Sequence, residues 1–145
     1  MESFTKEKSC GAIIYKIEKD KLLFLILHMS LGHYSLCKGH VENDETEVET
    51  AYREIKEETS LDVIIDQGFR EVITYSPKPG IMKDVVFFAA KTISNNVPID
   101  KHDEEVTSIE FLSFIDAYNK LTYEEDKNTL KKAYIYLGGK EDGRL

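Results

Sequence analysis

The sequence is short of cysteine and proline, and each shortage excludes a class of protein. Its 145 residues include 2 Cys and 3 Pro. Two cysteines cannot build a disulfide framework, and Cys10 and Cys37 do not form a Cys-x-x-Cys zinc pair. With 8 Gly and 41% apolar residues, the composition also excludes collagen-like and disordered chains. We therefore expect a globular cytoplasmic protein with two reduced thiols.

Long hydrophobic runs are absent as well. The longest, residues 22–27, is far shorter than the roughly 20 apolar residues that cross a membrane as a helix. The first six residues contain no apolar core of the kind that a signal peptide needs. The sequence thus predicts no association with a membrane.

Positive charge is the third scarce feature. Lysine and arginine total 19 against 27 acidic residues, which gives a net charge of −8. This balance argues against binding to duplex nucleic acid, which depends on neutralising phosphates. An anionic small molecule would need local cations or a metal ion. The length and the lack of a linker predict one domain over residues 1–145, and nothing specifies an oligomeric state.

Apolar patterning predicts a mixed α+β architecture in which strands come first, then a helix, more strands and two last helices. Asp44 with Glu47, Ser113, and Thr122 with Glu125 are the expected helix caps. The predicted strands are 11–16, 22–29, 34–36, 61–65, 69–75, 84–91 and 105–112, with a turn at 77–80. The predicted helices are 44–59, 114–120 and a last one that ends at Gly138.

The helix predicted over 44–59 carries an unusual group of acids. Glu54, Glu57 and Glu58 stand at i, i+3 and i+4, so they project from one side of the helix. Like charges at this spacing repel one another, and a divalent cation would turn that repulsion into coordination. Oxygen ligands favour Mg²⁺ or Mn²⁺. The structural alternative is a solvated acidic face.

The surrounding residues favour the metal hypothesis. The pattern G-x5-E-x7-R-E-U-x-E-E is formed by Gly39, Glu45, Arg53, Glu54, Ile55, Glu57 and Glu58. It resembles the Nudix box, the signature of the Nudix hydrolases, and would span residues 39–61. Ser60 stands where the box has a glycine. From composition alone, a chance match has a probability on the order of 10⁻⁵.

The resemblance implies a Nudix fold, in which a mixed sheet lies between α-helices, and a role for each box residue. It implies that Glu54, Glu57 and Glu58 bind Mg²⁺, with Mn²⁺ as an alternative. Arg53 would orient one of these carboxylates, and Gly39 would let its loop approach the metal site. We expect Glu58 to be the general base, with Glu105 as the second candidate. Glu45 is assigned a supporting role at the start of the helix.

Further residues are similar to the asymmetrically cleaving diadenosine tetraphosphate hydrolases. These are Lys38-Gly39-His40-Val41-Glu42, the start 10–15, the run 24–27, and 68–71 with Tyr75. The resemblance implies that Phe87 stacks on a base and that Lys83 serves the phosphates; Lys38 and Tyr75 are further candidates for substrate binding. For Phe87 and Tyr75, packing is the alternative. It also implies an acid for the metal site from His102-Asp103-Glu104-Glu105. Cys37 departs from the family pattern.

The predicted function is therefore metal-dependent hydrolysis of a small nucleotide substrate. The preferred reaction is asymmetric cleavage of diadenosine tetraphosphate to ATP and AMP by attack of water on phosphorus. A broad nucleotide or RNA 5′-pyrophosphate hydrolase is the enzymatic alternative. A Nudix-fold module that only binds nucleotide is the non-enzymatic one, although such a module would be expected to lose box carboxylates, and all are present here.

Overall fold

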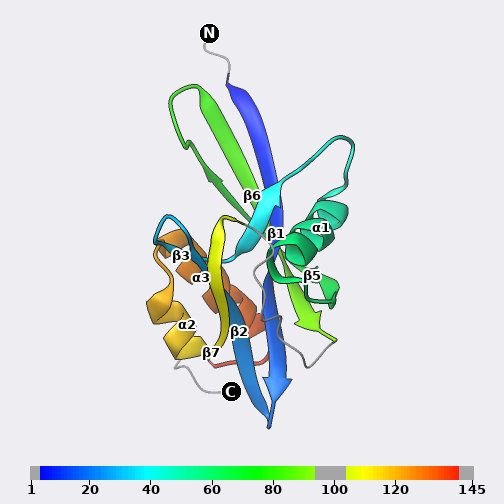
Figure 1. The fold of residues 1–145 in the computed structure, drawn as a ribbon, viewed down its shortest axis with the longest axis vertical. Coiled ribbons are helices and arrows are strands. Elements are labelled where there is room, and N and C mark those ends of the chain that lie inside the picture. Colours follow the sequence, from blue (N-terminus) through cyan, green and yellow to red (C-terminus); the bar gives the residue numbers. More distant parts are fainter. Residues whose placement is uncertain (1–3, 94–103, 141–145) are drawn as a thin grey trace.

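The computed structural model describes residues 4–93 and 104–140, and within these ranges it contains one sheet and three helices (Figure 1). The strands are β1 (Thr5–Glu18), β2 (Lys21–Met29), β3 (Tyr34–Ser35), β4 (Cys37–His40), β5 (Val63–Tyr75), β6 (Ile81–Thr92) and β7 (Val106–Ser113). The helices are α1 (Glu47–Thr59), α2 (Phe114–Lys120) and α3 (Glu124–Tyr136). His102 and Asp103, named above as candidates, lie outside the described residues.

The sheet is mixed, as predicted. Its main path runs β3-β2-β1-β6-β5, while β4 pairs with β1 and β7 pairs with β2. The long pairing of β1 with β6 is parallel, and the other pairings are antiparallel. Because β1 pairs with β2, β4 and β6, it forms the centre of the sheet and brings the segment that precedes α1 close to β6.

The central strands are buried on both faces, which explains their near-continuous apolar sequence. Alternate residues of β1, β2 and β6 enter two different cores. One core includes Ala51 and Ile55 of α1, and the other includes Phe114 of α2 and Leu130 of α3. Figure 1 shows α1 on one side of the sheet and α2 with α3 on the other. The predicted layer arrangement is confirmed.

Two predicted helix starts are wrong. Helix α1 is capped by Thr46, whose hydroxyl accepts from the Glu49 N–H while the Glu49 carboxylate accepts from the Thr46 N–H, so Asp44 with Glu47 is not the capping box. The chain turns into the helix later than expected because Glu45, before it, is held by Arg53. The cap of α2 at Ser113 is confirmed.

Helix α3 begins after Tyr123, and no side chain caps it. The predicted cap, Thr122, instead accepts a hydrogen bond from the backbone N–H of Tyr34. This hydrogen bond joins residues 88 positions apart. The hydroxyl that local sequence predicts as the helix cap is therefore engaged in a tertiary contact.

Further boundaries differ from prediction, most of all at β1, which begins at Thr5 instead of Gly11. Strand β5 is continuous from Val63 to Tyr75 instead of two strands, because a bulge between Asp66 and Arg70 absorbs the break expected at Gly68. Strand β4 was not predicted, since its four residues include a lysine and a glycine. Strand β6 begins three residues before the predicted start. None of the helices in the described ranges is long and apolar enough to cross a membrane.

Candidate active site

The guanidinium of Arg53 organises the acidic side of α1. Its Nε and Nη2 donate to the two carboxylate oxygens of Glu45, at 2.7 Å and 3.0 Å. Its Nη1 donates to Glu54 at 2.8 Å and to Glu57 at 3.1 Å, and Nη2 also donates to the backbone oxygen of His40 at 2.8 Å. The paired contact of Arg53 is therefore with Glu45, while Glu54 and Glu57 each accept a single bond from Nη1. Arg53 ties the helix to the loop before it and to the end of β4.

These contacts fix the charge of the network. Hydrogen bonds from Arg53 and from the backbone of Glu42 lower the pKa of Glu45 to about 2, and the carboxylates in turn raise the pKa of Arg53. Thr50 also donates to Glu45, at 2.9 Å. Glu45 is therefore ionised at any ordinary pH, and its supporting role is to hold Arg53 in place.

Gly39 on β4 lies directly against Glu54. A side chain at this position would overlap the Glu54 carboxylate, so only glycine allows the strand to pass this close to the helix. The same strand is pressed against β1, where a side chain at Gly11 would overlap the backbone of Cys37. The sequence predicted that a glycine at position 39 lets this segment approach the acidic residues closely, and the structure contains that close approach.

Glu58 has a neighbour that the family pattern does not provide. The Cys37 thiol donates to Glu58 Oε1 at 3.1 Å, and both residues are buried. Burial raises the pKa of Cys37, and the nearby Glu58 carboxylate raises it further, so the thiol keeps the proton that it donates. Cys37 therefore helps to orient the carboxylate that we expect to be the general base.

A pocket of about 490 Å³ opens beside these residues, and we call it the acidic pocket after the two glutamates that line it. Glu58 and Glu105 both line it, as do Lys38, Gly39 and Lys83, so the structure brings together five of the predicted site residues from four segments of the chain. The hydroxyl of Ser9 also lines the pocket, and it is buried without a hydrogen-bond partner among the described residues. A buried hydroxyl without a partner is suited to receive a polar ligand.

The carboxylates of α1 match a divalent cation in their chemistry. Glu54 and Glu58 are buried, Glu57 is more exposed, and all three present hard oxygen ligands on one side of the helix. Within residues 4–93 and 104–140, no three acidic, histidine or cysteine side chains converge closely enough to form a ready metal cluster. Arg53 supplies the positive charge here, since it binds Glu54 and Glu57. These three residues would hold Mg²⁺, with Arg53 bound to two of them.

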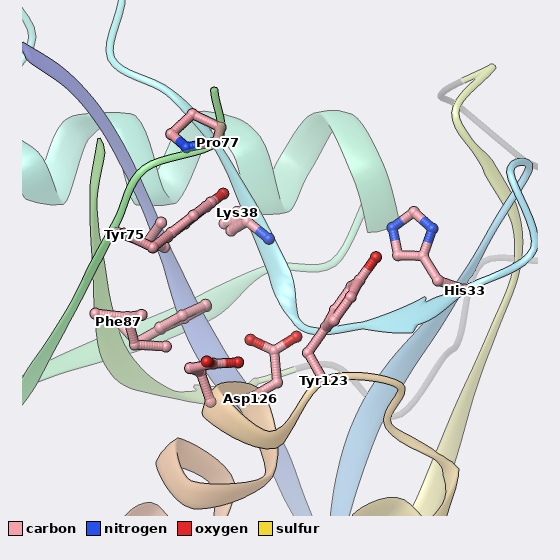
Figure 2. Close-up of a pocket in the computed structure, with 10 residues that line it drawn as sticks. His33, Lys38, Tyr75, Pro77, Phe87, Tyr123 and Asp126 are labelled. Carbon is pink, nitrogen blue, oxygen red and sulfur yellow. The ribbon is translucent and has the colours of Figure 1, made fainter. Parts of the chain in front are cut away.

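A second pocket, of about 450 Å³, adjoins the first and is walled by aromatic residues. Figure 2 shows Tyr75 and Tyr123 on opposite sides of it, with Phe87 below and Lys38 between. Tyr75 and Tyr123 are 40% and 51% exposed, so their rings are accessible to a ligand. His33 packs beside Tyr123, with ring centroids 5.8 Å apart. The pocket has the size and lining of a small-molecule site.

Two aromatic residues in this pocket differ from the sequence prediction. Phe87 has no exposed surface and belongs to the core, so packing accounts for its ring better than stacking does; Phe88 is buried on the opposite face. Tyr123 was not predicted at all. The available signal was an aromatic residue immediately before a helix, where a small polar cap is usual.

Asp126, in the first turn of α3, was also missed. It lines the aromatic pocket, and its Oδ2 atom is buried with no hydrogen-bond partner among the described residues. Burial raises the pKa of Asp126, whereas the charges of Lys38 and His33 act to lower it. Local sequence predicts only a helix-capping acid here, because acids are favoured in the first turn of any helix.

Lys38 connects the two pockets, since it lines both of them together with His33. Lys83 lies in the acidic pocket, where burial and the charge of Lys38 lower its pKa. Two lysines held close together against their mutual repulsion form a local positive region in a chain of net charge −8. An elongated polyanion could run along this region from one pocket to the other.

Comparison with known proteins agrees with this geometry. The family model described as the NUDIX domain matches residues 6–134. The chain therefore belongs to the Nudix family, and its fold is the α+β Nudix fold with a mixed sheet and three helices in the described residues. It is a Nudix hydrolase by family, and the members of this family typically depend on a divalent metal.

Curated relatives of similar length show which members of the family this chain resembles. The chain is 32% identical over 143 residues to a bis(5′-nucleosyl)-tetraphosphatase (asymmetrical) of Rattus norvegicus, a match that covers 90% of this chain and 95% of the relative. A protein of the same name in Caenorhabditis elegans is 31% identical over 137 residues, a match that covers 91% of this chain and 97% of that relative. The crystal structure of a C. elegans Ap4A hydrolase binary complex superimposes with a TM-score of 0.81 at 28% identity, over 90% of this chain and 97% of that one.

Proposed function

We propose that this Nudix hydrolase cleaves dinucleoside tetraphosphates asymmetrically, with diadenosine tetraphosphate giving ATP and AMP. The observation that carries the proposal is the pair of adjoining pockets that share Lys38. One pocket is suited to a base and the other to phosphates. The names of the relatives support the same substrate.

The aromatic pocket would hold one base of the substrate. We assign stacking to Tyr75 and Tyr123, which face each other across it, instead of to the buried Phe87. Stacking of a base on an aromatic ring is tolerant of base identity and is worth about 1–3 kcal/mol on alanine substitution. The two tyrosines would therefore supply affinity for a nucleoside that lies away from the reacting phosphorus.

The polyphosphate would pass Lys38 and Lys83 into the acidic pocket. Their ammonium groups would bind phosphate oxygens as point charges and compensate for the acidic surface elsewhere. The Ser9 hydroxyl, which has no partner among the described residues, would donate to the same phosphates. These contacts position the phosphorus beside Glu58 and Glu105.

Glu54, Glu57 and Glu58 would hold Mg²⁺, with Mn²⁺ as a substitute. Bound there, the ion would neutralise charge that develops on the phosphate oxygens during the displacement. Glu58 is our first choice to accept the proton of the attacking water, and Glu105, in the same pocket, is the second. The oxygen of water bonds to phosphorus, the phosphoanhydride bond breaks, and the leaving phosphate departs as an anion. Arg53 acts through Glu54 and Glu57 by setting their orientation.

Product analysis tests the proposal. Diadenosine tetraphosphate should give equal amounts of ATP and AMP, and in ¹⁸O-labelled water the label should enter one product only. Activity should vanish in a chelator and return with Mg²⁺ or Mn²⁺. The value of kcat/KM should exceed those for ATP, ADP-ribose and 8-oxo-dGTP.

Other outcomes would redirect the assignment. Two molecules of ADP would show symmetric cleavage and overturn the proposal. A higher kcat/KM for mononucleotides or for RNA 5′-pyrophosphate would favour the broader hydrolase. Binding of nucleotide without turnover in the presence of Mg²⁺ would leave a nucleotide-binding module.

A further inference from the structure

Asp126 presents a buried carboxylate inside the pocket that we assign to a base. The residue is 6% exposed, and its Oδ2 atom has neither solvent contact nor a hydrogen-bond partner in the described parts of the chain. Figure 2 shows Asp126 at the start of α3, in the space bounded by Tyr75, Tyr123 and Phe87. A buried acceptor without a donor is costly to the folded protein.

The surroundings do not supply the missing donors. Asp126 shares the pocket with Lys38 and His33, whose charges act on its pKa but which make no hydrogen bond to Oδ2. The neighbouring Glu125 adds negative charge. A ligand that enters the pocket can supply these donors, and rotation about the Cβ–Cγ bond can turn either oxygen toward it.

The bases differ in what they offer to a carboxylate. An ionised carboxylate only accepts hydrogen bonds, and it has two oxygens side by side. Guanine presents two adjacent donors, N1–H and the N2 amino group, so it can form a paired contact. Adenine presents its N6 amino group beside the N1 acceptor, and that lone pair would face a carboxylate oxygen. The same stacked position therefore rewards guanine and disfavours adenine.

We propose that Asp126 is a specificity-determining residue that favours guanine over adenine in the pocket between Tyr75 and Tyr123. This inference rests on the proposed function, since it assigns the base that the tetraphosphate substrate places there. Diadenosine tetraphosphate remains a substrate because stacking does not depend on base identity. A mixed substrate, adenosine–guanosine tetraphosphate, would bind mainly in one orientation.

The mixed substrate provides an internal competition. Asymmetric cleavage gives either AMP with GTP or GMP with ATP, so the ratio of AMP to GMP reports which base occupies the pocket. One monophosphate should exceed the other by between about 5-fold and about 150-fold, the range for one paired base contact. Equal amounts of the two from the wild-type enzyme would overturn the proposal.

The variant Asp126→Asn provides the decisive comparison. Asparagine places a donor beside an acceptor, which suits adenine, so the product ratio should fall to near one or reverse. Glu124→Gln is the matched control, because it removes the same charge from the first turn of α3 at an exposed position that does not line the pocket. An unchanged ratio in Asp126→Asn would show that Asp126 does not read the base.

Mononucleotide binding separates this inference from the proposed function and requires no variant. Calorimetry with GMP, IMP and AMP should give the tightest binding for GMP and the weakest for AMP, with IMP between them because it lacks the N2 amino group. If the mixed substrate is not cleaved, the proposed function fails, and this order still tests Asp126. Equal affinity for GMP and AMP would overturn the inference even if tetraphosphates are cleaved.

Discussion

The two pockets on either side of Lys38 are held in place by different forces. The acidic pocket lies beside the charged side of α1, where Arg53 holds Glu45, Glu54 and Glu57 through hydrogen bonds of 2.7 to 3.1 Å. Glu58 is the acid of this helix that lines the pocket. The aromatic pocket depends on packing, with Tyr75 from β5, Tyr123 before α3 and a buried floor at Phe87 from β6. Hydrogen bonds fix the positions of individual atoms, which suits a pocket proposed for bond cleavage. Aromatic packing fixes only the walls of a pocket, which suits base stacking.

Each pocket also contains one buried polar atom with no hydrogen-bond partner among the described residues. In the acidic pocket it is the Ser9 hydroxyl, and in the aromatic pocket it is Asp126 Oδ2. The hydroxyl can donate to a phosphate, whereas the carboxylate can only accept from a base. The two orphaned atoms thus match the two ends of one nucleotide. Changes to the acidic pocket should affect kcat, and changes to the aromatic pocket should affect KM.

The largest expected effect is on the acidic pocket. Glu58→Gln should lower kcat by about 10²- to 10⁴-fold, because the amide cannot accept the proton of water and binds a cation poorly. The melting temperature without metal should stay level or rise, since repulsion among the carboxylates falls. Steady-state kinetics and thermal unfolding test both. Glu49→Gln on the same helix is the control, because glutamine also serves in a capping box. A kcat near wild type in a folded Glu58→Gln would remove Glu58 from catalysis.

Arg53→Ala should disrupt the network of charges along α1 beside the acidic pocket. Loss of the guanidinium leaves Glu45, Glu54 and Glu57 without their shared partner, and we expect a loss of about 2–3 kcal/mol in the free energy of unfolding, between the values for exposed and buried pairs. Urea unfolding without metal measures it. Arg70→Ala, whose arginine pairs with Glu47 at a more exposed position, should cost less than about 1 kcal/mol.

The same network predicts how stability depends on pH. The pKa of Glu45 is about 2 in the folded protein against an ordinary value of 4.5, so its contribution to stability is complete above about pH 4.5. The contribution is lost as the pH falls from there through about 2. Arg53→Ala should show a smaller loss over this range than the wild type. Equal acid sensitivity of the two proteins would place the effect on other carboxylates.

Tyr123→Ala should weaken substrate binding in the aromatic pocket. Loss of one stacking wall should raise KM for diadenosine tetraphosphate by a factor that corresponds to about 1–3 kcal/mol, with little change in kcat, because the base lies away from the reacting phosphorus. Tyr123→Phe keeps the ring and should retain most of the affinity. A fall in kcat without a change in KM would place Tyr123 in the chemical step.

The smallest effect concerns the end of the helix that carries the acidic pocket. Ser60 has φ 60° and ψ 8°, a left-handed conformation that the glycine of the Nudix box would adopt without strain. A residue with a Cβ pays about 1 kcal/mol there, so Ser60→Gly should raise the melting temperature by about 2–4 °C and leave kcat unchanged. Destabilisation would show that the serine side chain stabilises the turn in another way.

The sequence by itself determined helix α1 and the charges along it. Glu54, Glu57 and Glu58 share one side of α1 because helical geometry alone puts i, i+3 and i+4 together. The mixed α+β architecture followed from apolar patterning along the chain, and the Nudix family was indicated by the resemblance of residues 39–61 to its box. The need for glycine at position 39 was also predicted, and the structure shows the carboxylate of Glu54 that a side chain would meet.

Only the tertiary structure decided the aromatic pocket and the starts of two helices. Tyr75 and Tyr123 are 48 residues apart in number, and no local period relates them; pairing of β5 with β6 and packing of α3 set them face to face. The hydroxyl of Thr122 accepts from Tyr34 instead of capping its own helix, and Phe87 lies in the core, where it forms the floor of the pocket. Periodicity specifies which residues share a face of one element, but which faces meet depends on the packing of the whole chain.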